Sequence, residues 1–255
     1  MYKYFLLPLL FIFTSCASNK NSDFEAKDII QTNGAIQIRK YLNDIDKLLL
    51  EYQVKLNKRN PSQSDKEFAQ IIKNEIENQK DRIKVTNLLS QDYTEYIEKA
   101  FEKDVKRANR NEYLILGIYK LIYDAYNRDE KNNFTALSYD IEKMERANEA
   151  LQVIFWRVKS YRNIKGEYLY LTWQKNWQVE LENRLRKGEK FSSELIENLS
   201  YIKENKETFF EASNQSFAQI EAKILYIIDK TLRLKGSEAT VLSTDALKAI
   251  ILLPF

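Results

Sequence analysis

The sequence is poor in the residue types that most often carry out catalysis. It contains no histidine and a single cysteine, Cys16, among 255 residues. Histidine is the commonest general base and metal ligand, and a thiolate is a frequent alternative. Ser-His-Asp chemistry and sites built from histidine are therefore excluded. Neither a nucleophile elbow nor a Gly-rich phosphate loop is present.

Acidic pairs are the remaining candidates for chemistry. Glu142 with Glu145 and Glu194 with Glu197 stand three residues apart, so each pair shares one face of a helix. Metal sites in helical bundles combine such acids with a Glu-x-x-His motif, which this sequence lacks. We therefore interpret both pairs as solvated helix faces and predict no catalytic residue, no metal site and no cofactor. A carboxylate-dependent glycan hydrolase stays open as an alternative, since two carboxylates suffice for glycoside cleavage.

Aromatic residues give the only candidate binding surface. Tyr170, Trp173 and Trp177 recur at helical spacing within a helix expected over 167–187, and Tyr119 and Tyr123 do so within a helix over 111–127. If the two faces meet, they line one groove where a glycan or a peptide could stack. The other interpretation is that these rings fill the core. Residues 168–173 also alternate in a way that a strand would.

The N-terminal residues indicate where in the cell the protein is located. Lys3 precedes an apolar run, Phe5–Phe13, which is shorter than the roughly 20 residues of a membrane-spanning helix and suits a secretory signal. Phe13-Thr14-Ser15-Cys16 then resembles the lipobox of bacterial lipoproteins. An ordinary signal peptide with an incidental cysteine is the alternative.

The resemblance implies that Cys16 becomes the first mature residue and carries the lipid. It also implies that no cysteine is left for other chemistry. Ala17 and Ser18, with no aspartate directly after Cys16, resemble the pattern of outer-membrane lipoproteins that face the periplasm. A Gram-positive origin would instead place the chain on the outer face of the plasma membrane.

Composition predicts an all-α fold behind that anchor. Only 5 Gly and 3 Pro occur, whereas sheets and tight turns need more. We expect a signal peptide over 1–15, a flexible tether over 16–34 and a helical domain over 35–255, an irregular bundle of about seven or eight helices. Apolar periodicity predicts helices over 35–59, 65–88, 91–105, 111–127, 136–162, 167–187 and 246–253, with one helix or two over 194–235.

Three local signals refine this pattern. Ser64 to Glu67 matches a capping box that would open the second helix. The helix over 111–127 is apolar nearly all round, which predicts a central position in the bundle. Gly117 inside that helix predicts a close approach of a neighbouring helix.

We therefore expect a lipid-anchored, non-enzymatic scaffold or accessory subunit of a cell-envelope assembly, with envelope proteins as partners. A periplasmic ligand-binding module is the first alternative and the glycan hydrolase the second. The net charge of +3 from 40 basic and 37 acidic residues argues against a nucleic-acid partner.

Overall fold

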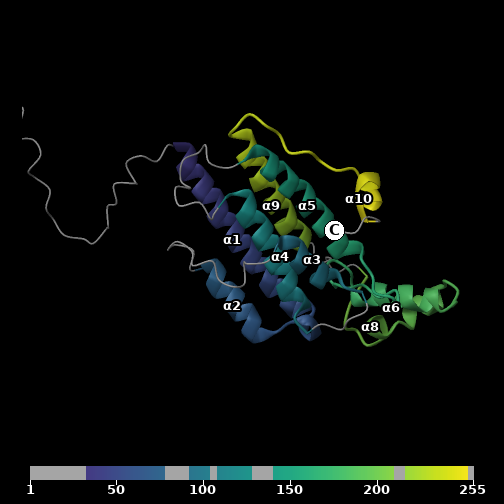
Figure 1. The fold of residues 1–255 in the computed structure, drawn as a ribbon. Coiled ribbons are helices and arrows are strands. Elements are labelled where there is room, and N and C mark those ends of the chain that lie inside the picture. Colours follow the sequence, from purple (N-terminus) through teal and green to yellow (C-terminus); the bar gives the residue numbers. More distant parts are fainter. Residues whose placement is uncertain (1–32, 78–91, 104–107, 128–139, 210–215, 252–255) are drawn as a thin grey trace, which may run out of the picture. The chain divides into compact units, whose positions relative to one another are not determined.

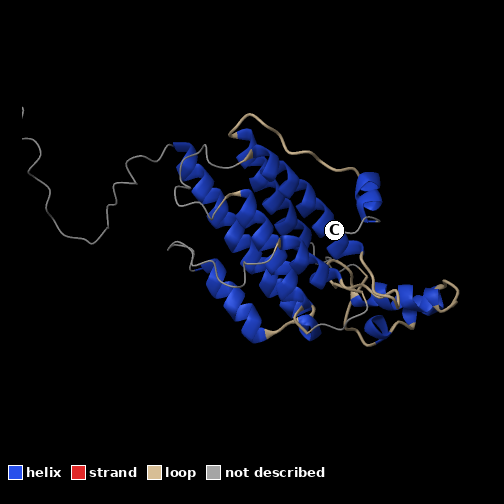
Figure 2. Ribbon diagram, viewed as in Figure 1, coloured by secondary structure: helices blue, strands red, loops and turns tan. Residues whose placement is uncertain are grey.

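The fold is described from a computed structural model, which covers residues 33–77, 92–103, 108–127, 140–209 and 216–251. These residues belong to one compact unit, Thr32–Phe255. Cys16 and the expected signal peptide lie outside the described residues, as does the expected tether as far as residue 32. Within the described ranges the elements are ten α-helices and one short 3-10 turn, so the predicted all-α fold is confirmed (Figure 2).

Four long helices form the centre of the unit (Figure 1). They are α1 (Asn33–Arg59), α4 (Arg110–Ala125), α5 (Ile141–Ser160) and α9 (Ser216–Arg233). Helix α1 packs against α4 and α9, and α5 packs against the same two helices. Each presents apolar residues every three or four positions, and burying those stripes together removes them from water.

Helix α4 is buried on nearly all sides, as its composition predicts. From Leu114 to Ala125, only Lys120 and Asp124 are not buried. Helix α3 (Tyr93–Phe101) lies against it so closely that a methyl group at Gly117 would sit 2.5 Å from the Ile97 Cδ1 atom. The close approach expected at Gly117 is therefore confirmed.

The start of α2 (Lys66–Glu77) differs from the sequence prediction. Asp65, not Ser64, accepts hydrogen bonds from the backbone N–H groups of Glu67 and Phe68. The Ser64 hydroxyl instead donates to the carboxylate of Glu112, at the first turn of α4. Ser64 does not cap the helix because its hydroxyl lies beside the buried Glu112 carboxylate, which needs hydrogen-bond donors.

A network of polar side chains joins the end of α1 to its neighbours. The Glu112 carboxylate, on a residue with no exposed surface, accepts hydrogen bonds from Asn57 Nδ2 at 3.2 Å and from the Asp65 N–H at 3.2 Å. Asn111 Nδ2 donates to the Asn57 side chain and to the Asn60 carbonyl. Burial raises the pKa of the Glu112 carboxyl, while these hydrogen bonds oppose the rise. The network fixes the direction of the chain between α1, the 3-10 turn η2 (Pro61–Gln63) and α2.

The helix expected over 167–187 is wrong in its first half. Residues 167–175 are not helical, and α6 spans only Asn176–Arg186. The Asn60 side chain donates to the Leu171 carbonyl and accepts from the Leu171 N–H, and Gln63 Nε2 donates to the Leu169 carbonyl. These distant side chains take the backbone groups that a helix would pair within itself. An isolated antiparallel bridge joins Arg162 to Tyr168, but bends follow at residues 169–170 and 172–173, so this stretch is irregular and is not a strand.

The last third of the chain contains several short helices. The region over 194–235 holds α7 (Ser193–Glu197), α8 (Ser200–Lys203) and α9, so neither one helix nor two describes it. The N-terminus of α6 is capped by Glu207, whose carboxylate accepts from the N–H groups of Asn176 and Trp177. Helix α10 (Thr244–Ile251) lies against α5 and ends the described chain.

Candidate functional site

The five aromatic residues predicted to line a groove do not share one surface. Tyr119 and Tyr123 are buried in α4, with ring centroids 6.0 Å apart. Tyr170 is buried in the irregular segment over 167–175, where its hydroxyl donates to the Ala100 carbonyl at 2.9 Å. Trp173 is 42% exposed, and Trp177 lies on α6.

The neighbours of these rings show what each one does. Tyr170 packs edge-on against Phe101 with centroids 5.7 Å apart, and burial raises the pKa of its hydroxyl, which stays protonated as a donor. Trp177 packs against Phe209 with centroids 5.1 Å apart. The shared groove was predicted from a helix that includes residues 170 and 173. That helix is absent there, so the groove loses its geometric basis.

The acidic pairs lie at the surface of the unit. Glu142 is exposed and forms an ion pair with Arg146, one turn further along α5, at 3.4 Å. Glu145 accepts a hydrogen bond from the Ser237 hydroxyl. Glu194 and Glu197 are exposed on α7. Among the described residues, no group of three or more acidic, histidine or cysteine side chains could hold a metal ion.

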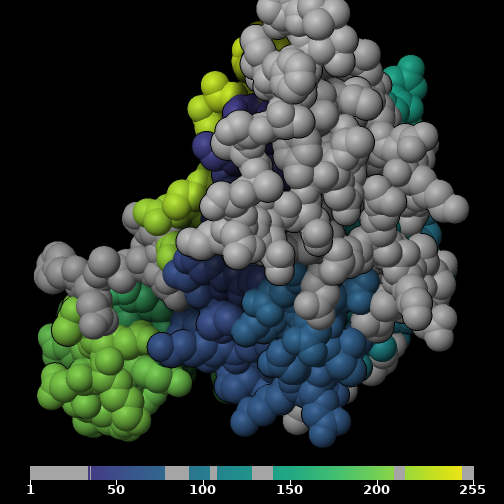
Figure 3. Space-filling model, turned by 90° about the vertical axis from the view of Figure 1, so that its left-hand side faces the viewer, coloured from purple at the N-terminus to yellow at the C-terminus, as the bar shows by residue number. Residues whose placement is uncertain are grey.

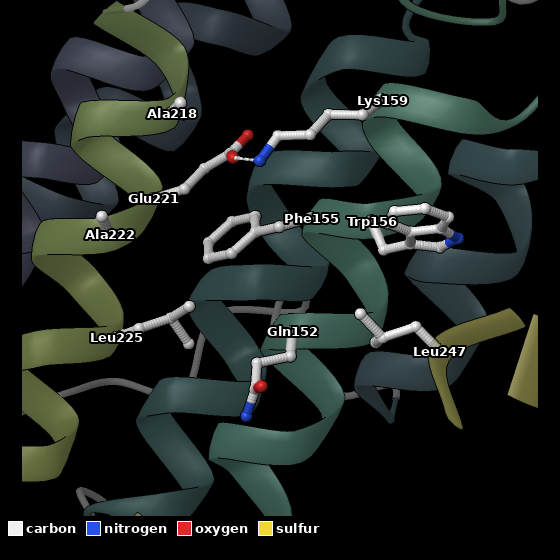
Figure 4. A pocket seen from close by; sticks show the side chains of 9 residues that line it. All are labelled: Gln152, Phe155, Trp156, Lys159, Ala218, Glu221, Ala222, Leu225 and Leu247. Carbon is white, nitrogen blue, oxygen red and sulfur yellow. Dashed lines mark ion pairs between the residues drawn. The ribbon is translucent and has the colours of Figure 1, made fainter. Parts of the chain in front are cut away.

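A pocket that the sequence did not predict lies between α5 and α9, with Leu247 of α10 beside it (Figure 4). Its volume is about 220 Å³. Each long helix contributes residues at positions i, i+3, i+4 and i+7, which is the spacing of one helical face. On α9 two of these residues are alanines, which leave room between the helices. The lining residues on α5 and α9 are Gln152, Phe155, Trp156, Lys159, Ala218, Glu221, Ala222 and Leu225.

A charged pair stands in this pocket. Lys159 Nζ lies 2.5 Å from Glu221 Oε2, and the two side chains reach toward each other from α5 and α9 (Figure 4). The Glu221 side chain is 3% exposed and that of Lys159 is 34% exposed. The Tyr52 hydroxyl of α1 donates to Glu221 Oε1 at 3.0 Å from the core side. The carboxylate therefore faces the protein, and the ammonium is the part of the pair that solvent reaches.

Burial governs the electrostatics of this pair. It raises the pKa of the Glu221 carboxyl, while the Lys159 ammonium and the hydrogen bond from Tyr52 oppose the rise. Burial also raises the pKa of the Tyr52 hydroxyl, and the nearby Glu221 raises it further. Tyr52 thus remains a neutral donor. The pair can position a polar group at the pocket, with aromatic side chains beside it.

One sequence signal could have pointed to Glu221. On α9 the residues Phe217, Ile220, Ile224 and Ile228 form the buried face, and Glu221 is the acid within that apolar stripe. A charge on an otherwise apolar face needs a buried partner. Its partner Lys159 stands 62 positions earlier in the sequence, so the sequence alone does not identify it.

Comparison of the chain with protein-family models, with curated proteins and with solved structures finds no match. Within the described ranges, no helix combines the length and the apolar character that crossing a membrane requires.

Proposed function

We propose that the chain is a lipid-anchored protein of the bacterial cell envelope that acts as a non-enzymatic scaffold or accessory subunit. The observation that carries the proposal is the position of Cys16, the only cysteine, directly after Phe5–Phe13 and the small residues Thr14 and Ser15. Acyl chains contribute about 0.8 kcal/mol per buried CH₂, so two or three chains on one cysteine hold a protein stably on a bilayer.

The residues next to Cys16 favour one membrane. Ala17 and Ser18 follow it without an aspartate directly after the cysteine. This arrangement supports placement in the outer membrane, with the domain facing the periplasm.

The composition of the domain supports the non-enzymatic role. A lipidated Cys16 leaves a chain with no free thiol and no histidine. The acids paired in sequence already have surface contacts, with Arg146 for Glu142 and with Ser237 for Glu145. A packed helical unit that offers its surfaces to partners fits a scaffold or an accessory subunit.

Metabolic labelling with a clickable fatty acid tests the anchor. We expect the wild-type chain to carry the label and Cys16→Ser to carry none. Ser18→Ala is the matched control, because it changes a neighbouring residue outside the lipobox and should keep the label. Labelling that persists in Cys16→Ser would overturn the proposal. A pull-down from detergent-solubilised membranes tests the accessory role, which loses its support if only the monomer is recovered.

The pocket between α5 and α9 supports a second candidate function, the binding of a small envelope ligand. The observation in its favour is the Lys159–Glu221 pair beside the aromatic side chains of Phe155 and Trp156. Tryptophan fluorescence titrated with peptidoglycan fragments or short peptides tests it. We expect a saturable change that Trp156→Phe abolishes and Trp173→Phe retains. A flat titration would count against this function.

A further inference from the structure

Two turns lie next to each other at the surface of the segment that contains α6 to α8. The first, at residues 163–166, is closed by the Asn163 side chain, which accepts from the N–H groups of Lys165 and Glu167. The second, at residues 187–191, follows the end of α6. Gly166 of the first turn lies against the guanidinium of Arg186, the residue before the second turn, since a methyl group at Gly166 would overlap that guanidinium. In Figure 3 the light-green residues of this part of the chain form a lobe at the lower left of the view.

Each turn exposes a large apolar side chain. Ile164 is 73% exposed in the first turn, and Phe191 is 67% exposed in the second. Leu185, in the last turn of α6, is 38% exposed. Moving these exposed apolar side chains from water into an apolar environment lowers the free energy.

Basic residues surround these apolar side chains. Residues 163–167 and 184–191 contain five basic and two acidic residues, a net charge of +3. Both acids already have partners: Glu167 accepts from Asn163 Nδ2, and Glu189 forms an ion pair with Arg184 at 2.7 Å. The five cations are Lys165, Arg184, Arg186, Lys187 and Lys190. Arg184 is paired with Glu189, and Arg186 lies 3.7 Å from the Glu182 carboxylate, so the three lysines supply the positive charge of this surface.

This combination matches a lipid surface better than a protein groove. Exposed apolar residues enter the boundary between headgroups and acyl chains, while nearby cations interact with anionic headgroups. The apolar side chains stand on two separate turns and not along one helix face, so they do not form the continuous stripe that fills a groove on a partner. We propose that the two turns form a membrane-docking surface for bilayers with anionic lipid headgroups.

The docking surface goes beyond the anchor and does not depend on it. A lipid on Cys16 would attach the chain at one residue and would not by itself determine which side of the domain faces the bilayer. The two turns would select the side of the domain that faces the bilayer.

Quenching of a tryptophan by brominated acyl chains tests the contact directly. The probe is a vesicle of brominated phosphatidylcholine with about one third phosphatidylglycerol, because anionic lipid supplies the attraction. In the full chain we expect Phe191→Trp to add a quenched, blue-shifted emission to the wild-type signal. Val54→Trp is the matched control, since Val54 is also 67% exposed but lies on α1. Ile164→Trp provides a second reporter, on the other turn, should Phe191→Trp perturb the fold.

Partition measurements then test the role of the charges. They use the full chain with Cys16→Ser, so that no acyl chain contributes. Lys187→Gln with Lys190→Gln should weaken partition about 30-fold, from about 1 kcal/mol per cation near an anionic surface. The matched control, Lys66→Gln with Lys73→Gln on α2, should leave partition unchanged.

The proposal is overturned if tryptophans at 191 and 164 are quenched no more than one at 54, or if both lysine pairs have equal effects. Failure of the anchor gives a different result, the loss of fatty-acid label from the wild-type chain. The two outcomes are therefore distinguishable.

Discussion

Replacing Lys159 with methionine should destabilise the domain in a way that depends strongly on pH. The substitution keeps the apolar stem and removes the ammonium that lies 2.5 Å from Glu221. The carboxylate, 3% exposed, then loses its cation and keeps only the hydrogen bond from Tyr52. Removing one partner of a buried ion pair typically costs about 3–5 kcal/mol.

Proton uptake limits this cost. From the ordinary carboxyl pKa of 4.5, protonating Glu221 at pH 7 costs about 3.4 kcal/mol, at about 1.36 kcal/mol per pH unit. At pH 5 the same limit is about 0.7 kcal/mol. Burial raises the pKa of Glu221 in the folded state, so its contribution to stability is fully present below the unfolded pKa and is lost as pH rises toward neutrality. We therefore expect a loss of about 2–3 kcal/mol at pH 7 and under about 1 kcal/mol at pH 5.

Urea unfolding of the wild type and of Lys159→Met at both pH values measures these losses. The same substitution in a Glu221→Gln background is the control, because no charge is then left uncompensated, and it should cost under about 1 kcal/mol at either pH. Equal losses at pH 5 and pH 7, or an equal loss in the Glu221→Gln background, would refute the reasoning.

Three further predictions concern the packing at Gly117, the irregular segment over 167–175 and the N-terminal cap of α5. Gly117→Ala should lower the free energy of unfolding by about 1 kcal/mol, because overpacking against Ile97 costs about 1–3 kcal/mol and the better helix propensity of alanine offsets about 1 kcal/mol. This loss, measured by urea unfolding, should be smaller in an Ile97→Ala background. Strictly additive losses for the two substitutions would contradict the contact. Asn60→Ala leaves the Leu171 N–H and carbonyl without their partner and should cost about 2–4 kcal/mol. Faster hydrogen exchange at the Leu171 amide should accompany it, and unchanged exchange there would argue against the assigned bonds. Asp140→Ala removes the cap of α5 and should cost about 1 kcal/mol, whereas Asp140→Asn should cost little; equal losses for the two would contradict a capping role.

The helices with the clearest apolar periodicity were predictable because that signal is local. Helix α1 ends at Arg59, before Asn60-Pro61, where the sequence places its end. Helix α4 is buried on nearly all sides, and its Gly117 meets Ile97 closely, both as composition indicates. Ser243 caps α10 by accepting from the Ala246 N–H, a contact that is also local in the sequence. Spacings of three and four residues decide such features, whichever elements lie nearby.

The predictions that were wrong depended on residues far away in the sequence. Residues 167–175 have helical spacing, but side chains more than 100 positions earlier bind their backbone groups. Ser64 looks like an N-cap, but its hydroxyl donates to Glu112, 48 positions later. The predicted aromatic groove lost its geometric basis for the same reason, because residues 170–173 are not helical and Tyr170 and Trp173 share no helical face.

Residue types and local spacing were enough to predict the helical class, the approximate ends of the most periodic helices and the lipobox resemblance at Cys16. These depend on residue type and on neighbours within a turn or two. The approach of Lys159 to Glu221, of Asn60 to Leu171 and of Gly166 to Arg186 became known only from the tertiary structure. The physical reason is that a buried polar group or a surface cluster needs partners of the right chemistry, and packing alone decides which distant residues supply them.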